Sequence, residues 1–163
     1  MTALGTDALT LIHTAISLIA IALGFVLVFA MMGGRASRIL IQSFLLFTLL
    51  VSITGFLFPQ AGPQPTPAQL TGVVSLAVLV VALFALYGRG LDGSWRWIFV
   101  VTALTAQWLD VFVLIIQLFL KVPALYALHG TIPPSGPVFG TVQGLTLIFF
   151  LVAGYLSVKR FRP

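Results

Sequence analysis

Few side chains in this chain could carry out chemistry. Its 163 residues include three Asp and two His, with no Glu and no Cys. Paired carboxylates perform general acid–base work in many hydrolytic enzymes, and thiolates act as nucleophiles and metal ligands. The composition therefore argues against a carboxylate-pair enzyme and excludes disulfides and cysteine-based metal sites. Asp110, His13 and His129 remain to be interpreted.

Asp110 is the ionisable residue that most needs an explanation. It lies thirteen residues after Trp97 and eleven before Lys121, in the middle of a long apolar segment. A charged carboxyl at the centre of a membrane-spanning helix costs roughly 2.5–3.5 kcal/mol on insertion scales, which makes it a candidate ion or proton site. A carboxyl buried there can also be protonated and serve only as a hydrogen-bonding group. Both interpretations stay open.

Polar residues flank Asp110 on one face of the helix expected around it. At about 100° per residue, Gln107, Gln117 and Lys121 fall within about 80° of Asp110's face. Polar residues of other apolar segments share the depth of Gln117, roughly 6–9 Å below one surface. We hypothesise an outward-facing polar vestibule with Asp110 at its floor. Its candidate residues are His13, Gln107, Asp110, Gln117, Lys121 and Gln143.

A second interpretation needs no vestibule. Ser, Thr and Gln in membrane helices often form interhelical hydrogen bonds worth about 0.6 kcal/mol each. His13 shares a face with Ser17 and Gly24, a pattern typical of a packing seam of small residues that carries one polar group. Because His129 falls in a loop, paired axial ligation of a haem is disfavoured. We expect no cofactor and no metal site.

Small residues also mark the start of the last apolar segment. Gly136, Gly140 and Gly144 repeat at intervals of four residues, a spacing that lets two helix backbones approach closely. Together with Gly24, these glycines are the candidate helix-packing positions. The spacing leaves open whether the partner helix belongs to the same chain or to another.

The amino-acid composition indicates that these residues lie in a protein embedded in a lipid bilayer. Apolar residues make up 60% of the chain, charged residues only 7%, and the mean hydropathy is +1.18. Apolar runs of about 20 residues, the length that crosses a bilayer, occur five times. The sequence predicts an all-α integral membrane bundle, one domain over residues 1–163, with four spans plus an interfacial segment as the alternative. The predicted spans are 9–31, 39–58, 70–87, 97–120 and 138–158.

The basic residues predict how the bundle lies in its membrane. Seven of the eight fall on one side of the predicted spans, and Lys121 alone falls on the other. By the positive-inside rule the N-terminus is outside and the C-terminus in the cytoplasm. The same distribution, at span ends rather than in one basic domain, argues against nucleic acid as a partner. Between the fourth and fifth spans, Pro123 is expected to open a short helix that Gly130 stops.

Four stretches of the chain resemble a known group of proteins. They are TGFLFP from Thr54, ALYGRGLDGSWRW from Ala85, DVFVLIIQLFLKVPAL from Asp110, and the terminal VKRFRP. Together they resemble uncharacterised small multi-pass proteobacterial inner-membrane proteins. The resemblance implies an inner-membrane location and a helical fold, but no activity. In that group an Asn commonly stands where this chain has Asp110, which favours a polar packing or recognition role over a titrating carboxylate.

These observations lead to one main functional expectation and two alternatives. The main expectation is a non-enzymatic membrane protein, an accessory subunit or envelope helper, whose partners are the lipid bilayer and other membrane proteins or itself. One alternative is a small transporter or channel with Asp110 as its central site. The other is a quinone- or lipid-binding protein that uses the same vestibule, with Lys121 near a lipid phosphate.

Overall fold

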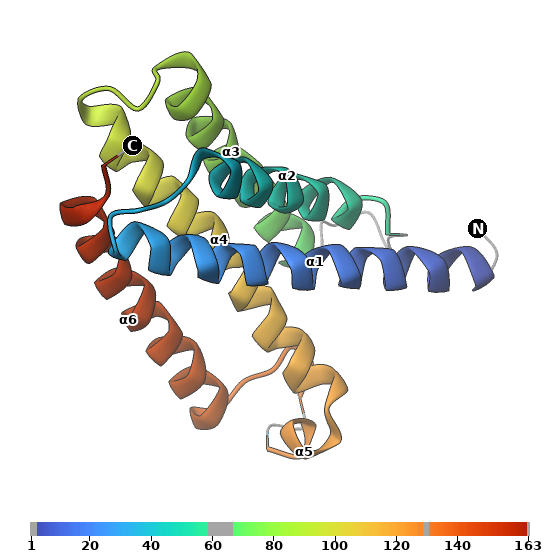
Figure 1. Ribbon diagram of the computed structural model, residues 1–163. Helices are drawn as coiled ribbons and strands as arrows, with labels where there is room; N and C mark the ends of the chain where they lie inside the picture. The colour runs from blue at the N-terminus through green and yellow to red at the C-terminus, as the bar shows by residue number, and fades with distance from the viewer. Residues whose placement is uncertain (1–2, 59–66, 129–130, 163) are drawn as a thin grey trace.

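The computed structural model describes residues 3–58, 67–128 and 131–162, in which helices are joined by turns and loops and there is no strand (Figure 1). Five helices are long and apolar enough to cross a membrane, which confirms the predicted helical bundle. The α3 helix continues directly into a π-helical segment, η1. The elements are α1 (Ala3–Met32), α2 (Arg38–Gly55), α3 (Pro67–Leu83), η1 (Phe84–Gly88), α4 (Ser94–Lys121), α5 (Pro123–Tyr126) and α6 (Pro137–Arg160).

Local sequence explains where the helices begin and end. Ser37 caps α2 by accepting a hydrogen bond from the Leu40 backbone N–H at 3.2 Å. Gly34 adopts a positive φ of 74° in the turn before it, a conformation that costs glycine little. Pro123 opens the short helix α5, as its fixed φ predicts, and the expected stop at Gly130 lies outside the described residues. His129 also lies outside them, as does most of the stretch 59–69 between the second and third predicted spans; its last residues, Pro67 to Gln69, belong to α3 and not to a loop.

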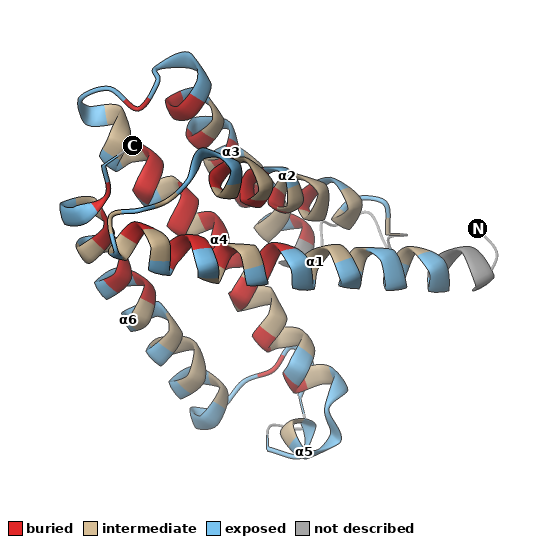
Figure 2. Cartoon of the chain, in the orientation of Figure 1, coloured by how far each residue is buried: buried red, intermediate tan, exposed pale blue. Residues whose placement is uncertain are grey.

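The α4 helix is the centre of the bundle. It contacts α1, α2, α3 and α6, whereas α3 and α6 do not touch. Half of its most apolar stretch is buried inside the protein, against 17% for α6 (Figure 2). The polar residues of α4 therefore lie among other helices, while much of α6 faces outward.

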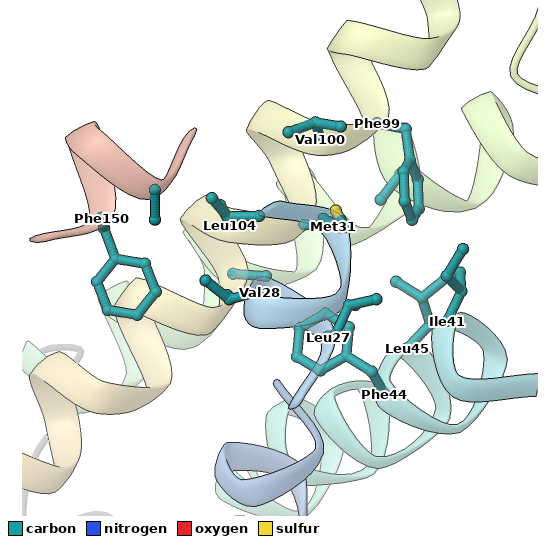
Figure 3. Packing of buried hydrophobic residues seen from close by; sticks show 14 of the residues in the cluster. Leu27, Val28, Met31, Ile41, Phe44, Leu45, Phe99, Val100, Leu104 and Phe150 are labelled. Carbon is teal, nitrogen blue, oxygen red and sulfur yellow. The ribbon is translucent and has the colours of Figure 1, made fainter. Parts of the chain in front are cut away.

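The packed core lies toward one end of the bundle. Leu27, Val28 and Met31 of α1 meet aromatic and aliphatic side chains of α2, α4 and α6 there (Figure 3). Toward the other end packing is looser, because no residue from 7 to 19 or from 137 to 149 is buried. In a membrane these stretches would face lipid or a partner.

The tightly packed end also carries most of the positive charge, and we call it the basic end. The Arg96 guanidinium donates to the carbonyls of Val158 at 2.8 Å and Phe161 at 2.7 Å, joining the start of α4 to the end of α6. Arg160 reaches the Met32 carbonyl at the end of α1, at 3.4 Å. The loops that carry the other basic residues lie at this end, and Lys121 lies at the opposite end of α4 (Figure 1).

Candidate functional site

Asp110 faces a polar residue of α2. Its carboxyl interacts with the side chain of Thr48, which is fully buried. Neither Asp110 Oδ2 nor Thr48 Oγ1 has a hydrogen bond that meets normal geometry, although both atoms are buried. Buried polar atoms are nearly always paired, so these two atoms are exceptions that need an explanation.

Gln107 lies one turn before Asp110 and makes a helix-packing contact. Its side chain is fully buried, and its Nε2 donates to the Ile21 carbonyl of α1 at 3.0 Å. Gly24 makes room for this carboxamide, because a Cβ there would overlap it, with Gln107 Nε2 at 2.7 Å and the oxygen closer still. Gln107 therefore joins α1 to α4 instead of lining an open vestibule.

His13 joins α1 to α2 nearer the opposite end. Its Nδ1 lies 2.8 Å from Thr54 Oγ1, and the Thr54 hydroxyl donates to the Leu50 carbonyl at 2.7 Å. Because that hydroxyl proton is already used, Thr54 Oγ1 is left to accept from the ring, an arrangement that favours the Nδ1–H tautomer of His13. The ring also packs edge-on against Phe58, with centroids 5.2 Å apart.

Lys121 and Gln117 extend the same polar side of α4 toward the opposite end. Lys121 is exposed and close enough to His13 for their charges to interact. Gln117 is half-buried one turn before it. Three of the predicted vestibule residues thus lie toward the same end of the bundle, opposite the basic end: His13, Gln117 and Lys121. No interaction in the described structure joins them to Asp110.

Gln143 lies apart from the other vestibule candidates. Its Nε2 donates to the Phe112 carbonyl at 3.2 Å, which joins α6 to α4. Phe112 follows Asp110 by two residues, about 200° around the helix, so this contact is on the opposite face of α4. The prediction grouped Gln143 with the others by depth alone, and depth does not fix which face of a neighbouring helix a residue meets.

The three glycines at the start of α6 differ from Gly154 further along it, whose Cβ would lie 3.7 Å from Leu104 of α4. Gly136 adopts a positive φ of 94° just before α6, and a Cβ on Gly136, Gly140 or Gly144 would meet nothing within 4 Å. Gly24 packs tightly against Gln107, whereas these three glycines have open space where a side chain would begin; Gly136 and Gly140 are exposed and Gly144 is half-buried.

Several contacts that matter were not singled out from the sequence. Ser52 Oγ lies 3.2 Å from Ser75 Oγ and joins α2 to α3. Arg96 was counted only as a positive charge, yet it caps the end of α6. A serine or an arginine has so many common roles that its type and spacing alone gave no indication of these partners.

The chemical capacity of the arrangement is narrow. Among the residues that the structure describes, no three His or acidic side chains come together as a metal site. Comparison with models of protein families, with curated proteins and with solved structures finds no match to this chain. What the geometry offers is one buried carboxyl facing a hydroxyl, a series of interhelical hydrogen bonds, and a largely bare last helix.

Proposed function

We propose that the protein is a non-enzymatic component of a bacterial inner membrane that acts by associating with another membrane protein, as an accessory subunit or envelope helper. The observation that carries the proposal is the bare surface of α6 at Gly140 and Gly144. Helices in lipid gain little from hydrophobic burial and associate through close backbone approach, for which glycine is the best residue. A helix of the partner would lie against this half of α6.

The polar contacts inside the bundle support a structural rather than a catalytic role. His13, Gln107 and Gln143 each hold a second helix through a hydrogen bond. A hydrolase would need a nucleophile next to a base, or a metal set, in hydrogen-bonding geometry. These interhelical contacts hold the helices in fixed positions, and they leave the outer surface of α6 available to a partner.

The orientation belongs to the same proposal. The positive-inside rule puts the basic end in the cytoplasm, with the N-terminus and Lys121 outside. The bare glycines, near the start of α6, then lie in the outer half of the membrane. We infer that the partner meets this protein in that half.

Mass spectrometry of the gently extracted protein tests the association. We expect a partner protein in fixed stoichiometry, which is lost in Gly140→Leu and retained in the control Val152→Leu. Val152 is 54% exposed on another part of α6, so both variants enlarge a bare position without disturbing the core. A lone protomer from native membrane, or a partner indifferent to Gly140→Leu, would contradict the proposal.

The contact between Asp110 and Thr48 favours a second candidate, a small ion or proton transporter. Two buried polar atoms that face each other without a well-formed hydrogen bond, in the middle of a membrane-spanning bundle, offer a place for a proton or a small cation. Flux into liposomes should then fall in Asp110→Asn. If the purified protein gives no flux above empty liposomes, or if Asp110→Asn leaves the flux unchanged, this candidate fails.

A further inference from the structure

A groove separates α4 from α6 on the face of α4 that is opposite Asp110. It encloses about 340 Å³ and is almost entirely apolar. The groove is lined by Val101, Leu104, Thr105, Trp108, Leu147, Phe150, Leu151, Gly154, Tyr155 and Val158.

The groove has the length and depth of one membrane leaflet. From Leu147 to Val158 the α6 backbone rises about 16 Å, close to half of a ~30 Å hydrocarbon core. Trp108 is the α4 lining residue farthest from the basic end, and Val101, Tyr155 and Val158 line the part of the groove nearest to the basic end. An acyl chain entering from the leaflet at the basic end would run along it.

A cation stands at the mouth of the groove. Lys159 Nζ lies 4.3 Å from the centroid of the Tyr155 ring and donates to the Tyr155 hydroxyl. Tyr155 itself lines the groove, so this contact holds the lysine beside the opening. In the described part of the chain Lys159 has no carboxylate partner. Its charge is free for an anion at headgroup level.

We propose that this groove binds an anionic phospholipid, with an acyl chain between α4 and α6 and the phosphate at Lys159. Charge complementarity decides the headgroup, since a juxtamembrane lysine attracts an anionic lipid more strongly than a zwitterionic one.

The lipid site is separate from the surface assigned to a partner protein. The glycines of that surface, Gly140 and Gly144, precede Leu147, the first α6 residue of the groove. The inference therefore does not depend on the proposed association, and either can fail without the other.

Fluorescence quenching by brominated lipids tests the site, with Trp108 as the reporter. Trp95→Phe and Trp97→Phe leave Trp108 as the single tryptophan, at the depth of a mid-chain bromine. The full-length protein is placed in vesicles of phosphatidylglycerol and phosphatidylcholine in varied ratio, with either lipid dibrominated on its chains. We expect the groove to prefer phosphatidylglycerol about fivefold, the effect of one juxtamembrane lysine.

Two further variants assign the preference to Lys159 and to the groove. Lys159→Gln should bring the preference to about one, whereas Arg89→Gln, which removes an equal charge next to Trp95 at the same end, should leave it unchanged. Gly154→Leu should fill the groove and reduce quenching by both lipids. Equal quenching by the two lipids in the parent protein, or a preference that survives Lys159→Gln, would overturn the proposal.

Discussion

Gly24 of α1 and Gln107 of α4 occupy one shared space at the centre of the bundle. The Gln107 carboxamide lies where a side chain on residue 24 would begin, and its nitrogen donates to the Ile21 carbonyl one turn earlier on α1. The hydrogen bond therefore depends on the glycine. This contact fixes how closely α1 can approach the central helix.

Gly24→Ala should destabilise the protein by about 1–3 kcal/mol, the usual cost of overpacking a core. Unfolding by denaturant in detergent micelles would measure the change. Adding Gln107→Ala should recover part of the loss, because it removes the group that the new methyl meets, and a double-mutant cycle would show the coupling. Gly140→Ala is the control, since nothing lies within 4 Å of its Cβ. Additive costs for the two changes would contradict the shared-space interpretation.

Thr54→Val should remove the acceptor of His13 and cost about 0.6 kcal/mol, the average interhelical hydrogen bond in a membrane. The sharper readout is the imidazole itself. In the parent protein, ¹⁵N NMR of the neutral ring should show the proton on Nδ1, because the Thr54 hydroxyl is committed to Leu50. Thr54→Val should shift the ring toward the Nε2–H form. Thr48→Val, which removes a hydroxyl of α2 that faces Asp110 and not His13, is the matched control and should leave the tautomer unchanged.

Arg96→Ala should loosen the end of α6. One guanidinium nitrogen of Arg96 donates hydrogen bonds to the carbonyls of both Val158 and Phe161. Hydrogen bonds that involve a charged group contribute about 1.5–3 kcal/mol to stability. Amide hydrogen exchange should accelerate at the last turn, where the Phe161 N–H bonds the Ser157 carbonyl at 2.8 Å. In Arg89→Ala, whose guanidinium packs over Trp95, exchange at this turn should match the parent protein. Unchanged exchange in Arg96→Ala would show that the cap is dispensable.

The sequence was a good guide to the positions of the helices and a poor guide to their faces. Hydropathy located all five spans because a membrane demands about 20 apolar residues from every helix that crosses it. The same demand makes all sides of such a helix apolar, so the pattern does not show which side meets a neighbour. Gln143 was grouped with Asp110 for this reason, although it meets α4 at Phe112, on the other face. Pairs such as Ser52 and Ser75 depend on helix rotation, which packing sets.

The orientation of the bundle can be measured directly, because the chain contains no cysteine and single cysteines can be introduced without background. Ser94 and Ser135 are matched positions, since both are exposed and lie at opposite ends of the bundle, Ser94 as the first residue of α4 and Ser135 just before α6. In intact spheroplasts a membrane-impermeant maleimide should label Ser135→Cys, and it should label Ser94→Cys only after the membrane is opened. The positive-inside rule gives this expectation, because Arg89 and Arg96 flank Ser94 and seven of the eight Lys and Arg residues fall at this end, with Lys121 at the other. Labelling of Ser94→Cys alone in intact spheroplasts would invert the orientation and, with it, the leaflet that supplies the lipid at Lys159.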